Sequence, residues 1–171
     1  MASRAARSRL VLCLALLLST LMPASVHAEN ACPWLNDATA SGLLGGTAVG
    51  VYTSAAQGQP AVCVFMQQTV AGARMLRLTV ETVVEPHMQL MKAARVCGTH
   101  AVPLPAIGNE AVVCTEWSGK KGNGEIALGR VRDQLFRIAL TSSLRRDSEL
   151  SGKNLRMHLS SAAEQVAGNL F

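Results

Sequence analysis

Hydrophobic and polar residues alternate most clearly between residues 76 and 85, where most even positions are apolar and most odd positions are charged or hydroxyl-bearing. This period of two predicts a β-strand with one face in a core and the other in solvent. We expect Leu78 and Val80 on the core face. Arg77 and Glu81 fall on the opposite face, which we expect to be exposed.

Three segments have the spacing of amphipathic helices. The first begins near Asp37, which we expect to cap it, and ends at Gly45-Gly46. The second follows Pro86, a residue suited to the first turn of a helix, and covers residues 87–96. The third covers residues 153–170. Its apolar stripe consists of Leu155, Leu159, Ala162, Val166 and Leu170.

The other strands are expected where short apolar runs lie between turn-forming residues. They cover residues 47–53, 61–69, 110–117, 125–132 and 135–142, with a Gly/Lys hairpin loop at 118–124. The element order is therefore α-βββ-α-βββ-α. Strands joined mostly by short turns favour antiparallel pairing, with helices packed on the sheet. The sequence thus predicts an α+β fold with a mainly antiparallel sheet of about six strands and three helices.

The last two strands are expected to be joined by a two-residue turn at Asp133-Gln134. The resulting pairs on the buried face are Val131–Phe136, Gly129–Ile138 and Ala127–Leu140. The same register places Arg130 opposite Arg137, an unfavourable pair that Glu81 on a neighbouring strand could relieve.

Residues 1–28 have the three parts of a secretory signal peptide. The positive start consists of Arg4, Arg7 and Arg9. The apolar run at 10–18 is short of the roughly 20 residues that a membrane-spanning helix needs, and we expect cleavage after Ala28. Cys13 lies inside this run and not after a lipobox, so a lipoprotein is not expected. We therefore expect residues 29–171 to form a single secreted or periplasmic domain without a membrane span.

The net charge of +5 overstates how basic this domain is. Three of the sixteen Lys and Arg residues lie in residues 1–28, which leaves thirteen basic against eleven acidic side chains, a net charge of +2. Binding to nucleic acid needs a concentrated basic face, but the basic pairs at 120–121 and 145–146 fall in predicted turns. We therefore expect no nucleic-acid partner.

Four cysteines lie in the predicted domain, an even number for an oxidising compartment. Of the three possible connectivities we favour sequential pairing, because each bond would then join a segment beside a helix to a nearby strand. The predicted disulfides are Cys32–Cys63 and Cys97–Cys114. A zinc site or a redox dithiol is the alternative, but no Cys-x-x-Cys motif occurs.

Several short motifs are spread over residues 30–170. They are Cys32-Pro33-Trp34-Leu35 with Ala38, Leu44-Gly45, Cys63, and Ile107-Gly108-Asn109-Glu110-Ala111. They resemble a family of uncharacterised secreted and lipoprotein domains that is common in actinobacteria. The resemblance implies an α+β, PsbP-like sandwich and brings no catalytic residues. This chain departs from the family pattern because it has no lipobox and carries a second cysteine pair.

His87, Met88 and Met91 are the most suggestive candidate for a ligand site. His87 and Met91 are one helical turn apart, and imidazole and thioether ligands suit copper. The simpler interpretation is that the methionines fill gaps in the core and the histidine faces solvent. We therefore expect no metal or cofactor, with copper as the alternative.

No motif of nucleophilic catalysis is present: Gly-x-Ser-x-Gly does not occur, and His87, His100 and His158 have no recognisable partner order. The sequence therefore predicts a disulfide-stapled, non-catalytic module that binds an unknown exported protein or small ligand. The alternatives are a small secreted enzyme with a site built from distant residues, and a periplasmic copper-binding protein. A deep pocket with convergent polar groups would favour the enzyme, and an exposed apolar patch would favour the binding module.

Overall fold

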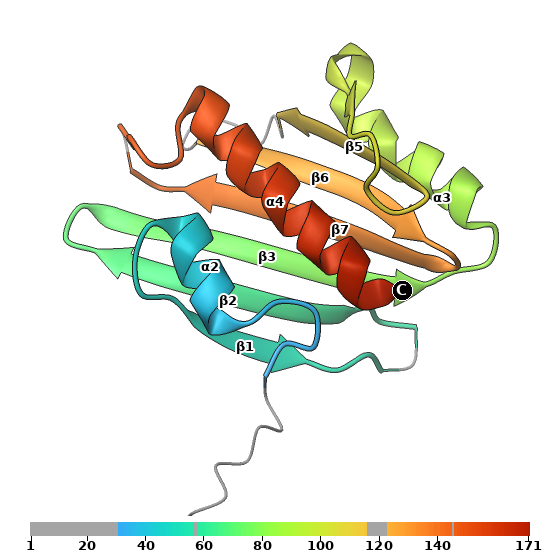
Figure 1. Cartoon of the computed structure of the whole chain (residues 1–171), viewed down its shortest axis with the longest axis horizontal. Coiled ribbons are helices and arrows are strands. Elements are labelled where there is room, and N and C mark those ends of the chain that lie inside the picture. Colours follow the sequence, from blue (N-terminus) through green and yellow to red (C-terminus); the bar gives the residue numbers. More distant parts are fainter. Residues whose placement is uncertain (1–30, 57, 116–122, 145) are drawn as a thin grey trace, which may run out of the picture.

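One antiparallel sheet of seven strands, in the order β1-β2-β3-β7-β6-β5-β4, forms the centre of the molecule (Figure 1). The computed structural model describes residues 31–56, 58–115, 123–144 and 146–171. The predicted signal peptide, the basic pair at 120–121 and most of the loop at 118–124 lie outside these residues. The strands are β1 (Val49–Thr53), β2 (Ala61–Thr69), β3 (Gly72–Thr82), β4 (Val102–Pro103), β5 (Glu110–Thr115), β6 (Asn123–Val131) and β7 (Gln134–Ser142).

The predicted α+β class is confirmed, with seven described strands in place of about six. The additional strand is β4, which pairs Val102 with Val113 and Pro103 with Val112 at the edge of the sheet. An edge is where a strand tolerates proline, because the missing N–H is not needed by a further neighbour. Two meanders, β1-β2-β3 and β4-β5-β6-β7, meet where β3 pairs with β7.

Helices cover both faces of the sheet, but unequally. They are α2 (Asp37–Leu44), α3 (Pro86–Ala93), which continues as the 3-10 segment η2 (Ala94–His100), and α4 (Gly152–Leu170). Helix α4 crosses β6 and β7 on the same face as α2, which packs against β1, β2 and β3 (Figure 1). Helix α3 and η2 lie on the opposite face, over β5, β6 and β7. Among these helices, none combines the length and the apolar character that crossing a membrane requires.

The alternation that predicted β3 is confirmed. Leu78 and Val80 are buried in the core beneath α2 and α4, whereas Arg77 and Glu81 are exposed on the other face. The strand begins earlier than its alternation, at Gly72, because β2 and β3 form a tight hairpin in which Thr69 pairs with Gly72. This hairpin brings Arg74 to the core face, two positions before Leu76.

The predicted register of the β6–β7 hairpin is wrong by two residues. The turn is at Arg132-Asp133, so Val131 pairs with Gln134, Gly129 with Phe136 and Ala127 with Ile138. Arg132 adopts the left-handed conformation that the turn requires, with φ 56°, and donates its N–H to Asn109 Oδ1 at 2.6 Å. A shift of two preserves the faces, so the predicted buried face is kept. Arg130 and Arg137 are not paired as predicted, because they lie opposite Leu135 and Leu128.

Two helix ends also differ from expectation. Asn36, and not Asp37, caps α2, because its Oδ1 accepts the N–H of Thr39 at 2.8 Å. Asp37 is the first residue of the helix. Helix α3 ends at Ala93 and continues as the tighter 3-10 segment η2, where a single α-helix to residue 96 was predicted.

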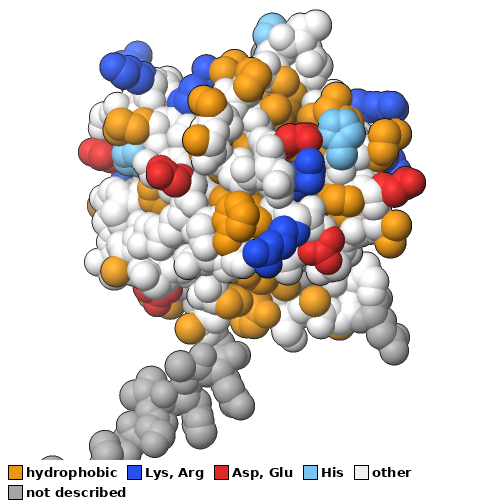
Figure 2. All heavy atoms as spheres, turned by 45° about the vertical axis from the view of Figure 1, so that its right-hand side comes forward, with side chains coloured by type: hydrophobic (Ala, Val, Ile, Leu, Met, Phe, Trp, Pro, Cys, Tyr) orange, Lys and Arg blue, Asp and Glu red, His pale blue; other side chains and the backbone are white. Residues whose placement is uncertain are grey.

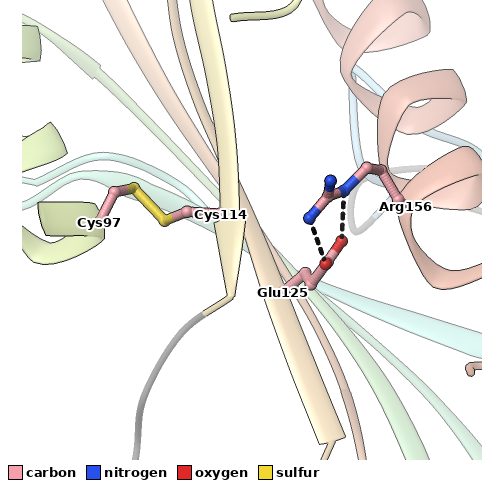
Figure 3. The surroundings of a disulfide bond; sticks show 4 residues. All are labelled: Cys97, Cys114, Glu125 and Arg156. Atoms are coloured by element: carbon pink, nitrogen blue, oxygen red, sulfur yellow. Dashed lines mark hydrogen bonds and ion pairs between the residues drawn. A yellow bond between two sulfur atoms is a disulfide. The ribbon is translucent and has the colours of Figure 1, made fainter. Parts of the chain in front are cut away.

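Both predicted disulfides are present. Cys32–Cys63 joins the segment before α2 to β2, and Cys97–Cys114 joins η2 to β5. Figure 3 shows the Cys97–Cys114 bond on one side of the sheet and the ion pair between Glu125 and Arg156 of α4 on the other. Each disulfide therefore attaches a segment outside the sheet to a strand within it.

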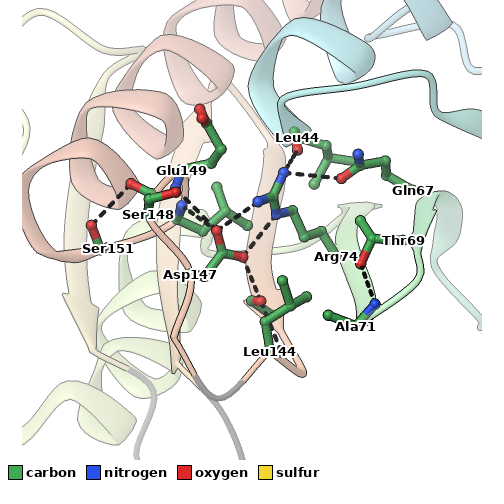
Figure 4. Close-up of polar contacts among 12 residues, drawn as sticks. Leu44, Gln67, Thr69, Ala71, Arg74, Leu144, Asp147, Ser148, Glu149 and Ser151 are labelled. Carbon is green, nitrogen blue, oxygen red and sulfur yellow. Dashed lines mark hydrogen bonds and ion pairs between the residues drawn. The ribbon is translucent and has the colours of Figure 1, made fainter.

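A buried ion pair holds the loop between β7 and α4 (Figure 4). Arg74 donates to both carboxylate oxygens of Asp147, at 2.8 and 2.7 Å, and also to the carbonyl oxygen of Leu44 at the end of α2. Asp147 accepts further hydrogen bonds from the Ser142 hydroxyl and the Leu150 N–H. Burial raises the pKa of Asp147, but these hydrogen bonds outweigh it and hold the pKa at about 2. Because every partner is internal, this network is structural.

Candidate functional site

The face of the sheet opposite α2 and α4 is covered over only part of its width in the described chain. Helix α3 and η2 pack over β5, β6 and β7, which leaves the same face of β1, β2 and β3 open. The strand register brings six hydrophobic residues together there, which we call the open face. They are Val49, Val51, Val62, Val64, Met66 and Met75. Val49 and Val51 are 65% and 63% exposed, so this is hydrophobic surface without a described cover.

An exposed cation lies at the border of the open face. Arg77 of β3 pairs with Val64 of β2 on one side and with Ala139 of β7 on the other. Glu81 is exposed on the same face of β3, four residues after Arg77 along the chain toward α3. Arg137 of β7, which pairs with Thr79, lies on the same face, so charged residues border the apolar area here and Arg77 offers a partner a polar contact beside it.

The edge of the sheet beside the open face is protected by side chains of α2. Asp37 Oδ1 accepts the N–H of Gly50 in β1 at 3.1 Å, and Ser41 Oγ accepts the N–H of Ala48 at 2.9 Å. Proteins protect edge strands from pairing with other chains in such ways. Because these two N–H groups already have hydrogen-bond partners, addition of a strand from another chain at β1 is disfavoured. A partner would therefore contact the open face and not the edge of the sheet.

A second feature is an apolar groove of about 330 Å³ between α3 and residues 103–112. Leu90 and Met91 of α3 form one wall, and the segment around Leu104 and Ile107 forms the other. Glu110, at the start of β5, also lines the groove.

Glu110 is the centre of a polar cluster that joins α3 to the sheet. Arg130, its neighbour in β6, donates from Nη2 to Oε1 at 2.8 Å, and the Nδ1 atom of His87 lies 2.8 Å from Oε2. The hydrogen bond from Arg130, followed by that from His87, lowers the pKa of Glu110 below its ordinary value. Glu110 is therefore an ionised carboxylate at neutral pH. Glu110 belongs to the motif at 107–111, but its contacts with His87 and Arg130 were not predicted.

Of the predicted ligand residues, His87, Met88 and Met91 all lie on α3, and all three are exposed. The interpretation in which both methionines fill gaps in the core is therefore wrong. Within the part of the chain that the structure describes, no group of three or more His, Cys, Asp or Glu side chains is arranged to hold a metal ion.

Beside α4 lies an open cavity of about 510 Å³, lined by Glu125, Lys153, Arg156 and Met157 among others. Glu125 is buried and its carboxylate is paired with Arg156 at 2.9 Å, so its charge is already satisfied. Figure 2 shows another part of the surface, where acidic and basic side chains are interspersed and hydrophobic side chains reach the surface between them. Among the described residues on that face, positive charge is not concentrated in the way that nucleic acid requires.

Comparison with family models, with curated proteins and with solved structures finds no match for this chain. The resemblance to the actinobacterial secreted domains therefore stays a prediction, and the function has to be argued from the surfaces just described.

Proposed function

We propose that this chain is an exported, disulfide-stabilised module that acts by binding another exported protein through the open face, and not by turnover. The observation that carries the proposal is the set of hydrophobic side chains on the uncovered half of the sheet, with Val49, Val51 and Met66 the most exposed. Burying a side chain of this size contributes about 1.5–3 kcal/mol. Contiguous hydrophobic surface left in water is a common mark of an interaction site.

The chemistry of the face favours a protein as the occupant. Small-molecule sites are concave, whereas the open face is the outer surface of three adjacent strands. Arg77 would pair with a carboxylate of the partner, and the protected N–H groups at β1 direct contact to the face and not to the edge. We therefore propose a partner with a flat apolar surface and an acidic side chain opposite Arg77.

Export is supported by the cysteines and by the leader pattern. Two disulfides are compatible with a location outside the cytoplasm, because they persist in oxidising compartments. Residues 1–28 supply the pattern of a secretory signal. The polar side chains beside the α3 groove are hydrogen-bonded to one another, as in Glu110 with Arg130 and His87.

The test places a photo-crosslinking amino acid at Val51, in protein exported by the producing cell. Ser161, exposed on α4 on the other side of the sheet, is the matched control position. We expect one adduct from position 51 and none from position 161. The adduct is then identified by mass spectrometry, and the identified protein is purified for direct binding measurements.

Purified partner should bind the wild-type chain at least about tenfold more tightly than Val51→Asp or Arg77→Glu, and equally to Ser161→Asp. Adducts of equal yield from both positions would refute the proposal. An adduct with the mass of two copies would mean that the open face binds a second copy of this chain. Flotation with anionic vesicles that depends on Val51 would mean that it binds a membrane. Either result would overturn the proposal of a protein partner.

A further inference from the structure

The helix α3 places three soft or borderline metal ligands next to one another. In an α-helix each residue is rotated by about 100° from the one before it. From His87, the side chain of Met91 lies about 40° around the helix and that of Met88 about 100° around it. Met91 therefore lies between the other two, within one helical turn, where side chains at this spacing are neighbours.

The two methionines do not contribute to the core. Met88 and Met91 are 63% and 55% exposed, while Leu90 is the buried residue by which α3 packs on the sheet. Methionine is common in cores because its flexible side chain fills gaps. That role is not available to these two thioethers, which lie on the surface beside a histidine.

The third ligand is oriented by a carboxylate. Glu110 Oε2 lies 2.8 Å from the Nδ1 atom of His87, so a proton shared between these two atoms leaves the Nε2 atom as the nitrogen that is available to a metal ion. Arg130 holds Glu110 in place from β6. A carboxylate on the second nitrogen of a histidine is the usual support of a metal-bound imidazole.

We propose that His87 Nε2, Met88 Sδ and Met91 Sδ bind a single Cu(I) ion. Thioether and imidazole ligands select Cu(I), whereas calcium and magnesium require oxygen ligands and structural zinc sites use thiolate, imidazole and carboxylate ligands. The four described cysteines are closed in disulfides, so thioethers are the sulfur ligands that these residues leave for a metal. Binding transfers no electron and breaks no bond in the protein.

The test measures the affinity of the intact domain for Cu(I) by competition with bicinchoninate, under nitrogen and with ascorbate, which keeps copper reduced. We expect one Cu(I) per chain in the wild type and loss of this binding in the Met88→Leu, Met91→Leu double variant. Leucine has nearly the same volume and these positions are exposed, so the fold should be kept. Met157→Leu, an equally exposed methionine on α4, is the matched control and should bind as the wild type does.

The positioning role of Glu110 has its own readout. Glu110→Ala should weaken Cu(I) binding by about 10- to 100-fold, the usual effect of losing the group that orients a metal-bound histidine, and Glu110→Asp should recover part of the loss. With ¹³C-methyl-methionine, the redox-inert ion Ag(I) should shift the signals of Met88 and Met91 at one equivalent and leave that of Met157 in place.

Equal affinity in the wild type and the double variant, an equal loss in Met157→Leu, or uniform Ag(I) shifts at all methionines would overturn the proposal. If Zn(II) binds the wild type and the double variant equally, that binding depends on the histidine and not on the two methionines. The copper site shares no residue with the open face, so either proposal can fail while the other stands.

Discussion

Replacing Asp147 with Asn tests whether the buried pair with Arg74 holds the loop between β7 and α4. The substitution keeps the shape of the side chain and removes its charge, so that Arg74 is left as an uncompensated buried cation. Breaking a buried ion pair in this way costs about 3–5 kcal/mol. We expect a loss of this size at pH 7 in urea denaturation, while Glu149→Gln, an exposed neighbour, should change stability by less than about 0.5 kcal/mol.

The pH dependence gives an independent estimate of the same interaction. The pKa of Asp147 falls from an ordinary 3.8 to about 2 in the folded protein. At about 1.36 kcal/mol per pKa unit, this difference corresponds to roughly 2 kcal/mol. Because the folded pKa is the lower one, this contribution is complete above the unfolded pKa and is lost as the pH falls through the folded value, between about pH 5 and pH 2.

Both results depend on the charge of Asp147 in the folded protein, so they must agree. The free energy of unfolding of the wild type and of Asp147→Asn, measured by urea titration from pH 7 to pH 2, should converge by about 2 kcal/mol as the pH falls. A difference that stays constant with pH, or a loss below about 1 kcal/mol at pH 7, would mean that Asp147 is not an ionised partner of Arg74.

Leu78→Ala should destabilise the protein by about 2–5 kcal/mol in denaturant titration, because it leaves a cavity beneath α4, whereas Glu81→Ala should stay within about 0.5 kcal/mol. Comparable losses from both would contradict the assignment of one buried and one exposed face to β3. Intact mass of the exported protein should correspond to a chain that begins at Glu29, less the hydrogens lost in two disulfides. A product that retains residues 1–28, or that reacts with thiol reagents when unfolded without a reductant, would refute this expectation.

The features that were predictable from sequence are those with a local pattern or a small number of combinations. The alternation at Leu78 and Val80 identified the core face of β3, because its signal lies within a few consecutive residues. The disulfides were predictable because four cysteines allow only three connectivities. The hairpin register was missed because a turn at Arg132-Asp133 and one at Asp133-Gln134 give the same two faces, and alternation alone cannot separate them.

Contacts between distant residues were not predictable in this way. Arg74 and Asp147 are 73 positions apart, and nothing near either residue indicates that they form a buried pair. The cluster of His87, Glu110 and Arg130 depends on both the register of β5 with β6 and the position of α3.

The most exposed residues of the two proposed sites lie outside the core, and this separates function from stability in an experiment. The core under α3 is made by Leu90 and by the Cys97–Cys114 bond, which together hold the helix over one half of the sheet. That position leaves Val51 uncovered on the other half and turns Met88 and Met91 to the surface. Substitutions at these exposed positions should change the free energy of unfolding by less than about 0.5 kcal/mol. Any loss of partner or Cu(I) binding in such variants therefore reports on the surface itself, whereas a loss in a variant of Leu78 or Arg74 would report on folding.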